Sequence, residues 1–356
     1  MSVHAAALAL IPRFSPRHWA QAALPGLGLA AALAGLAALL AQGSAMQQMG
    51  LSALTLAIAL GMLAGHSVLP VLPPRASQSL DRGVDFARST LLRAGIVLYG
   101  FRISFHDIAG VGWPGVWINV VMVAMILGAA ILIGTRWLSL DRQSALLIGA
   151  GSAICGAAAV MATQPVVRGD EHKVSMAIAT VMVFGTLSML LYPLAYPYLG
   201  LSAHSFGLFA GSTIHEVAQV VAVGDSIGPA AAQAAVVEKM LRVMLLAPVL
   251  LVLSLHGGSA PQTRSSWRQV QVPWFAFLFV AVSGLHSAQL LPAAWVAALV
   301  QLDTLLLATA MAAMGLRTRA SSLRRAGVRP LQLAGWLYLL LTVGGYAVNV
   351  GITALF

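Results

Sequence analysis

Four polar residues lie close together in an apolar stretch in the second half of the chain. They are Ser212, His215, Glu216 and Gln219. In a continuous helix this spacing follows the i, i+3, i+4, i+7 pattern and places all four side chains on one face. A histidine titrates near neutral pH, and an ionisable group inside an apolar segment usually faces a cavity or a partner. We therefore predict that His215 and Glu216 form a proton-coupling pair. The alternative is that they only hold neighbouring helices together through hydrogen bonds.

A second set of polar and glycine positions lies in the earlier stretch 144–167. It consists of Ser152, Cys155, Gly156, Thr163 and Gln164. Glycine lets the backbone approach a ligand closely, and a broken helix frees N–H groups that attract anions. The pattern predicts an anion or substrate cradle. Small residues also pack membrane helices together, and we favour that role for Gly149 and Ala157. Cys155 is expected to be an inert buried thiol.

Three charged residues, Glu238, Lys239 and Arg242, interrupt the apolar stretch 229–256. They could compensate charge at the site, or Lys239 and Arg242 could contact an anion. The alternatives are that they lie near a membrane end and snorkel, or that Glu238 pairs with Arg242 at i, i+4. Both interpretations stay open. Arg93 and Asp303 are weaker intramembrane candidates, and for Asp303 the alternative is a helix-start position near the outer surface.

The sequence does not favour metal or nucleotide chemistry. The His215–Glu216 pair lacks the second histidine of a His-Glu-x-x-His motif, because Gln219 stands there. Cys155 is the only cysteine, so a cysteine-based zinc site or an intrachain disulfide cannot form. We therefore expect no metal, no cofactor and no enzymatic activity. An intramembrane enzyme that uses Ser152, Cys155 or His215 is the alternative.

The composition indicates that the elements that position these residues are surrounded by lipid rather than by water. Hydrophobic residues make up 59% of the 356 residues and charged residues only 8%, against about 25% in soluble domains. We predict an all-α integral membrane protein, a single polytopic domain over 1–356 with about 9–11 transmembrane helices. The candidate spans are 20–41, 51–70, 90–105, 112–135, 144–167, 173–197, 204–224, 229–256, 272–290, 293–316 and 331–354.

The net charge of +10 comes from basic residues in short loops between apolar stretches. The positive-inside bias explains this distribution better than nucleic-acid binding. One side of the membrane receives Arg13, Arg17, Arg75, Arg82, Arg88, Arg136, Arg142, Arg264, Arg268, Arg317, Arg319, Arg324, Arg325 and Arg329. The other side receives Arg102, together with Arg168 and Lys173 if 144–167 crosses fully. We predict a cytoplasmic N-terminal tail (1–19) and a C-terminus on the outer side.

Two stretches of the chain resemble each other. AGSAICGAAAVMA begins at Ala150 and AGSTIHEVAQVVA begins at Ala210, and both contain a Gly-Ser pair. The two stretches are inverted if 144–167 and 204–224 are re-entrant hairpins, and parallel if both cross fully. We favour re-entrant or broken helices, because irregular backbone at membrane depth is tolerated where it is buried or lines a wet cavity.

A weaker echo relates Gly100 and Arg102 to Gly315 and Arg317. The spans that end at the two glycines are predicted to run in opposite directions. We therefore divide the chain into a first half (20–197) and a second half (204–356) of opposite orientation. Inverted repeats with discontinuous helices are typical of secondary transporters.

Five blocks of the chain together resemble the YeiH-like family of bacterial inner-membrane proteins. They are AGSAICGAAAVMATQPVVRGDEHKV, AIATVMVFGTLSMLLYPL, GSTIHEVAQVVAVG, VVEKMLRVMLLAPVLLVL and LDTLLLATAMAAMGL. The resemblance implies a multi-pass protein of the bacterial inner (plasma) membrane, with its C-terminus in the periplasm. It also implies a relation to inverted-repeat transporters such as the bile-acid and sodium–proton families. The family carries a proposed label of sulfate exporters, which implies a sulfate or organosulfonate solute.

These observations predict a secondary transporter or exporter of a small anionic solute. The expected partners are the lipid bilayer, the solute and a coupling proton or sodium ion, without nucleic acid; a homodimer is left open. An intramembrane enzyme is one alternative, and a passive channel or a scaffold is another. The polar groups resemble one site rather than the lining of a continuous pore.

Overall fold

The computed structural model describes residues 16–43, 52–67, 71, 73–256, 273–318 and 327–355. Within these ranges the regular elements are all helices. The segments long and apolar enough to cross a membrane are Ala23–Ala41, Phe105–Trp137, Glu171–Leu199, Ala293–Arg317 and Val328–Thr353. The predicted all-α integral membrane fold is thus confirmed. Residues 1–15 of the predicted tail, and Arg264, Arg268, Arg319, Arg324 and Arg325, lie outside the described residues.

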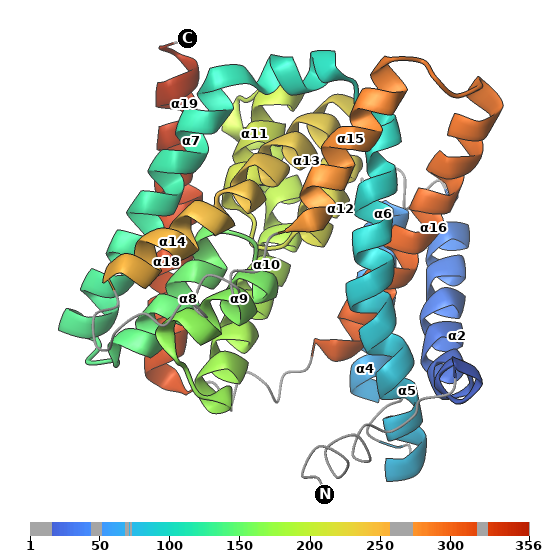
Figure 1. Cartoon of the computed structure of the whole chain (residues 1–356), viewed down its shortest axis with the longest axis horizontal. Helices are drawn as coiled ribbons and strands as arrows, with labels where there is room; N and C mark the ends of the chain where they lie inside the picture. Colours follow the sequence, from blue (N-terminus) through green and yellow to red (C-terminus); the bar gives the residue numbers. More distant parts are fainter. Residues whose placement is uncertain are drawn as a thin grey trace, which may run out of the picture.

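The helices form two groups, which Figure 1 shows side by side. The right-hand group contains α2 (Pro16–Ala41), α4 (Ala53–Ser67), α5 (Pro74–Phe86), the π-helical turn η2 (Ala87–Leu91), α6 (Leu92–Tyr99), α15 (Trp274–Ser287) and α16 (Ala293–Arg317). The left-hand group contains α7 (Phe105–Ile131), α8 (Arg142–Ala153), α9 (Ala157–Val167), α10 (Glu171–Leu199), α11 (Ala203–Thr213), α12 (Val217–Ile227), α13 (Pro229–Met244), α14 (Leu246–His256), α18 (Val328–Leu339) and α19 (Gly345–Thr353). The main contacts between the groups run from α12 to α4 and α16, and from α15 to α7 and α13.

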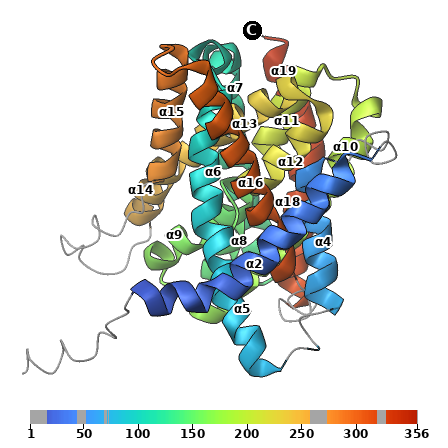
Figure 2. The ribbon, with the colours of Figure 1, turned by 90° about the vertical axis from the view of Figure 1, so that its right-hand side faces the viewer.

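Glycines bring helices of the right-hand group close together. Gly26 of α2 lies against Gly83 of α5, and Gly61 of α4 lies against Gly315 of α16. A Cβ atom on any of these glycines would collide with backbone atoms of the facing helix. In lipid, where apolar burial adds little between helices, such close backbone packing is a main source of association. Figure 2 shows α2, α4 and α16 crossing in this group.

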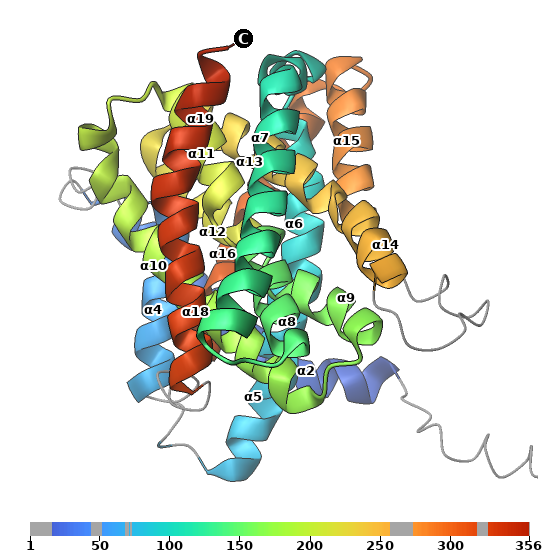
Figure 3. The same ribbon diagram turned by 90° about the vertical axis from the view of Figure 1, so that its left-hand side faces the viewer.

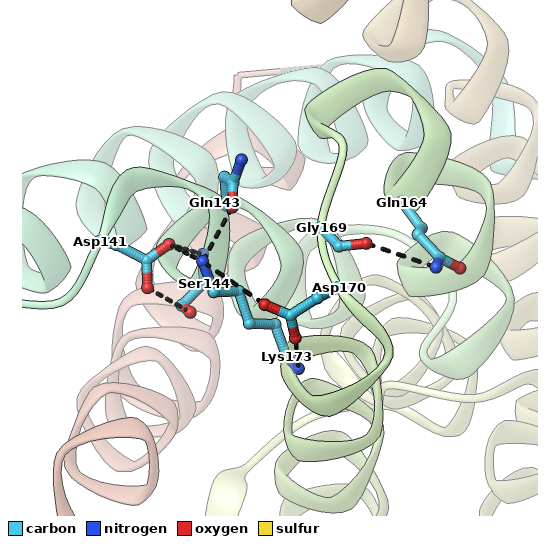
Figure 4. A network of polar contacts seen from close by, with 7 residues as sticks. All are labelled: Asp141, Gln143, Ser144, Gln164, Gly169, Asp170 and Lys173. Carbon is cyan, nitrogen blue, oxygen red and sulfur yellow. Dashed lines mark hydrogen bonds and ion pairs between the residues drawn. The ribbon is translucent and has the colours of Figure 1, made fainter.

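The first broken segment, α8 and α9, is a re-entrant hairpin. Lys173, in the first turn of α10, donates hydrogen bonds to Asp141 Oδ1 at 2.9 Å and to Gln143 Oε1 at 2.8 Å, as Figure 4 shows. Asp141 is the N-cap of α8, so α8 begins beside the point where the chain leaves α9 and enters α10. The segment therefore returns to the side from which it entered, and Arg168 and Lys173 lie on the same side as Arg142.

The second broken segment, α11 and α12, is also a hairpin, and α13 packs against both of its arms. Gly207, near the start of α11, contacts Ala231 of α13, while Gly224, near the end of α12, contacts the adjacent Ala232. The start and the end of the hairpin thus lie at the same end of α13. The first hairpin ends where α10 begins and the second begins where α10 ends, so they enter from opposite sides (Figure 3).

Arm length places the tips of both hairpins inside the membrane. α8 has 12 residues, and α9, α11 and α12 have 11 each. At 1.5 Å per residue, such helices extend roughly 16–18 Å, about half of a hydrocarbon core that is about 30 Å thick. The two breaks therefore meet near the middle of the membrane.

The weak sequence similarity between the stretches that begin at Gly100 and Gly315 corresponds to two reciprocal ionic contacts. Arg102, after α6, donates to Asp303 of α16 at 2.7 Å, and Arg317, at the end of α16, contacts Asp85 of α5 at 2.6 Å. The contacts lie at opposite ends of the two helices, so α5–α6 and α16 run antiparallel. Asp303 lies in the third turn of α16 and is fully buried, which agrees with its interpretation as an intramembrane residue and rules out the alternative of a helix start near the surface.

Candidate functional site

The tips of the two hairpins touch at Gly156 and Glu216. Residues 154–156 separate α8 from α9, and residues 214–216 separate α11 from α12. Gly156 has φ +71°, a conformation that L side chains rarely adopt, and a Cβ atom there would lie 2.5 Å from Cγ of Glu216. Glycine at position 156 is therefore required both by its own backbone and by the approach of the opposite hairpin.

Glu216 stands at the N-terminal ends of two half-helices. It is the N-cap residue of α12, and its Oε1 atom accepts a hydrogen bond from the backbone N–H of Ala157, the first residue of α9, at 3.3 Å. Its own N–H donates to Oε1 of Gln219 at 3.2 Å. The positive end of a helix dipole stabilises a nearby carboxylate, and here two such ends point toward one glutamate.

Lys239 of α13 stands at the opposite, C-terminal ends of the other two half-helices. Its ammonium group donates to the backbone carbonyl of Ile154 at 2.8 Å and to that of Ile214 at 2.5 Å. These carbonyls follow directly after α8 and α11. A cation stabilises the negative end of a helix, so Lys239 links both breaks electrostatically and through hydrogen bonds.

Arg242, one turn further along α13, completes the same arrangement. Its guanidinium donates to the carbonyls of Ser152, Ala153 and Ser212, which belong to the last turns of α8 and α11. Lys239 and Arg242 are both fully buried, so the prediction that they snorkel at a membrane end is wrong. Their donors are used inside the protein rather than at its surface.

Glu238 does not pair with Arg242, contrary to that alternative. Its Oε1 atom accepts a hydrogen bond from Nδ2 of Asn119 at 2.8 Å, on the side of α13 that faces α7. The i, i+4 spacing places Glu238 and Arg242 near each other along the helix, but the carbonyls of the broken segments provide Arg242 with more acceptors. Glu238 therefore belongs to the contact between α13 and α7.

The predicted polar face on one helix is not formed. Ser212 belongs to α11, His215 and Glu216 lie in the break, and Gln219 belongs to α12. Ser212 Oγ accepts a hydrogen bond from Asn349 Nδ2 at 2.9 Å. The helix ends between these residues, and the carbonyls of Ser212 and Ile214 at its end accept hydrogen bonds from cations of α13. The four residues are nevertheless close together, around one break.

Ser152, Cys155 and Gly156 of the residues predicted in the first broken segment lie at its tip, but Thr163 and Gln164 lie further along α9. Ser152 and Cys155 are buried beside Gly156. Gln164 lies near the end of α9, where its Nε2 atom faces the carbonyl of Gly169 at 3.4 Å, beside the network at the hairpin base (Figure 4). The structure therefore does not bring Gln164 to the crossing.

Several buried polar atoms of the broken segments have no hydrogen-bond partner in the described part of the chain. They are Ser152 Oγ, Thr163 Oγ1, His215 Nδ1 and Gln219 Nε2. Buried polar groups are nearly always paired, so these unpaired groups call for a specific explanation, such as a water or a bound solute. Among the described residues, no group of three or more His, Cys, Asp or Glu is placed to hold a metal ion.

Three groups that contribute to this arrangement were not predicted from the sequence. The N–H of Ala157 acts through the backbone, which residue type does not reveal. Asn119 and Asn349 are buried amides on α7 and α19 that contact Glu238 and Ser212. A lone asparagine in an otherwise apolar span was a usable signal for both, because a polar side chain inside a membrane needs a partner.

Comparison with known proteins agrees with this architecture. The family described as Conserved hypothetical protein 698 matches residues 25–334. A UPF0324 membrane protein of Pseudomonas aeruginosa is 50% identical over 334 residues, which cover 91% of this chain and 93% of the relative. A UPF0324 membrane protein of Yersinia pestis is 48% identical over 337 residues, 92% of each chain.

A relative named for its location is almost as similar. The UPF0324 inner membrane protein YeiH of Salmonella typhimurium is 47% identical over 335 residues, which cover 93% of this chain and 95% of the relative. No solved structure matches the chain significantly. The resemblance inferred from the sequence blocks is confirmed, and the chain belongs to the UPF0324 family of bacterial membrane proteins, which includes the inner membrane protein YeiH.

Proposed function

We propose that this chain is a secondary transporter of a small anionic solute across the bacterial inner membrane. The observation that carries the proposal is the meeting of two re-entrant broken helices at Gly156, Ala157 and Glu216. Secondary transporters build their solute and ion sites from discontinuous helices of opposite orientation near the midplane. No other part of the described chain combines broken helices with buried charges in this way.

The charges at the crossing support an anionic solute. Lys239 and Arg242 are buried there, and the N-terminal ends of α9 and α12 add partial positive charge. Glu216 lies at the N-terminal ends of α9 and α12, so its protonation would remove the negative charge at the place where an incoming anion could meet the partial positive charge of these two helix ends. Glu216 and His215 are accordingly the proposed carriers of a coupling proton. A sulfate or organosulfonate solute fits this chemistry.

The proposal is tested in two steps with purified full-length protein. A thermal-shift screen in detergent against sulfate, sulfonates and carboxylates identifies the solute, since a ligand at about 100 times its Kd stabilises the folded state by about 2.7 kcal/mol. Uptake of the identified anion into proteoliposomes then measures transport. Absence of flux for every anion that raises the melting temperature would contradict a transporter.

Matched variants separate the site from the rest of the protein. His215→Ala and Glu216→Gln are expected to abolish flux while the protein still inserts into the membrane. His172→Ala and Glu171→Gln change the same residue types at the exposed start of α10 and are expected to transport normally. Normal flux in both site variants would refute the assigned roles.

Two other functions were considered. An intramembrane enzyme would need a nucleophile and a base within hydrogen-bond reach. Ser152 Oγ and His215 Nδ1 are both without a partner in the described part of the chain, so they do not bond to each other. A passive channel would need a polar pore lining, whereas the polar groups described here gather at one crossing. Single-channel currents from purified protein would favour the channel.

The proposed orientation has the N-terminus in the cytoplasm and the C-terminus in the periplasm. It rests on the basic residues at one end of the helices, including Arg142, Arg168, Lys173 and Arg317, and on the positive-inside bias. Figure 1 places the start of α2 and the end of α19 on opposite faces of the molecule. An alkaline phosphatase fused after the C-terminus should be active and a green fluorescent protein there dark; the reverse would invert the orientation.

A further inference from the structure

The carbonyl groups at the C-terminal ends of α8 and α11 accept hydrogen bonds from two buried cations. In secondary transporters, unwound carbonyls and half-helix C-terminal ends are the groups that coordinate a coupling sodium ion. Here the carbonyls of Ile154 and Ile214 face the ammonium of Lys239. Those of Ser152, Ala153 and Ser212 face the guanidinium of Arg242.

We propose that Lys239 and Arg242 act as tethered cations that occupy the place of a coupling metal cation, so that this protein neither binds nor requires sodium. The inference rests on the proposed transport function and names its coupling chemistry. Both side chains come from one face of α13, three residues apart, and each reaches both broken segments. One helix thus supplies both donors that the two negative helix ends need.

The geometry leaves little for a mobile cation to bind. An ammonium has three donors and a guanidinium five, and together they engage five carbonyls at the two breaks. Both cations are fully buried, so a sodium ion placed beside them would meet strong repulsion that water does not screen.

The neighbouring carboxylates do not restore a cation site. Glu216 lies on the other side of the breaks, at the N-terminal ends of α9 and α12, where it accepts from Ala157. Glu238 is turned toward Asn119 of α7. Neither carboxylate has an oxygen within 4.0 Å of a side-chain nitrogen of Lys239 or Arg242. The carbonyl cradle is therefore neutralised by the protein's own cations and not by an acidic pair awaiting sodium.

The experiment compares the melting temperature of the purified full-length protein in sodium, lithium and choline chloride at equal ionic strength. The wild-type protein is expected to melt at the same temperature in all three salts. A saturable rise that is specific to sodium or lithium would overturn the proposal. This measurement needs no transported solute, so its outcome is independent of whether the flux experiment finds a transporter.

A variant gives the converse test. Lys239→Met keeps the length of the side chain but leaves the carbonyls of Ile154 and Ile214 without their donor. The expected result is a lower melting temperature that recovers in part in sodium or lithium chloride relative to choline chloride. Lys173→Met, which changes the only other lysine of the chain at the hairpin base, should show no such salt specificity.

The salt dependence of the Lys239→Met melting temperature shows whether a small cation can replace the lysine ammonium at these carbonyls. Recovery by small cations supports the tethered-cation interpretation, and a Lys239→Met protein that folds but responds equally to all three salts overturns it. If Lys239→Met does not fold, the wild-type comparison still decides whether the protein binds sodium. Lys239→Arg, which keeps a buried cation, should then remain insensitive to the choice of salt.

Discussion

The backbone N–H of Ala157 donates a hydrogen bond to Oε1 of Glu216 over 3.3 Å, and this bond joins the tips of two hairpins that enter from opposite sides. The residue before Ala157 is Gly156, whose missing side chain makes room for Glu216. On the opposite side of the breaks, Lys239 spans both hairpins through their carbonyls. At both breaks, the acidic Glu216 thus lies at the N-terminal helix end and the basic Lys239 lies at the C-terminal helix end.

Gly156→Ala should damage this contact directly. The new Cβ atom would lie 2.5 Å from Glu216 Cγ, and the residue would keep an unfavourable positive φ. Backbone strain of this kind costs about 1–3 kcal/mol, so the melting temperature and the flux should both fall. Gly128→Ala on α7 is the matched control, because a Cβ atom there meets nothing within 4 Å; it should be neutral or slightly stabilising. A fully active Gly156→Ala protein would contradict the close approach.

Arg242→Ala should be one of the most destabilising single changes in the chain. It removes a fully buried guanidinium and leaves the carbonyls of Ser152, Ala153 and Ser212 without their donor. Breaking a buried charged arrangement costs about 3–5 kcal/mol, which denaturation in detergent or reduced membrane yield would measure. Arg136→Ala, at an exposed position after α7, should change stability by less than about 0.5 kcal/mol. Equal stability of the two variants would show that Arg242 does not stabilise the broken segments.

The fold and the location of the site could largely be predicted from the sequence. Length and apolarity identify the spans, and the Gly-Ser pairs at Gly151 and Gly211 mark the two segments that break. Glu216 and Lys239 stand out because a charge inside an apolar segment needs a partner. These signals are local, and a single sequence contains them.

What could not be predicted depends on contacts between distant segments. The sequence favours re-entrant or broken helices, but the pairing of Lys173 with Asp141 that closes the first hairpin is not contained in any local pattern. Lys239 and Arg242 bind backbone carbonyls, and every residue has such a carbonyl, so no residue type identifies their partners. The helical face assigned to Ser212 and Gln219 is not formed, because the exact position of the break between them could not be read from the pattern.

Asp141 should make the base of the first hairpin sensitive to acid. Partial burial raises the pKa of its carboxyl, but hydrogen bonds from Ser144 and Lys173 outweigh this effect and hold the pKa below its usual range. The ionised carboxylate therefore stabilises the folded state above the usual aspartate pKa, and this contribution is lost as the pH falls through the lowered pKa. Asp141→Asn, which keeps an N-cap side chain, should flatten the acidic limb of the melting-temperature profile; an unchanged profile would contradict this role.

The two reciprocal arginine contacts should differ in strength. Asp303 is fully buried where it meets Arg102, whereas the side chain of Asp85 is 59% exposed where it meets Arg317. Exposed ion pairs contribute about 0.2–1 kcal/mol because water and salt screen them. Removing one partner of the buried pair instead leaves a charge without compensation, at a cost of about 3–5 kcal/mol.

Double-mutant cycles on unfolding free energy measure this difference. The cycle of Arg102→Ala and Asp303→Ala should give the larger coupling energy, and Arg102→Ala should be partly rescued by Asp303→Ala because the buried carboxylate left without its partner is removed. The cycle of Arg317→Ala and Asp85→Ala is the matched comparison, and high salt should weaken it more, because exposed charges are screened most. Equal coupling energies in the two cycles would mean that burial does not set the strength of these contacts, and that the two ends of α16 are held alike.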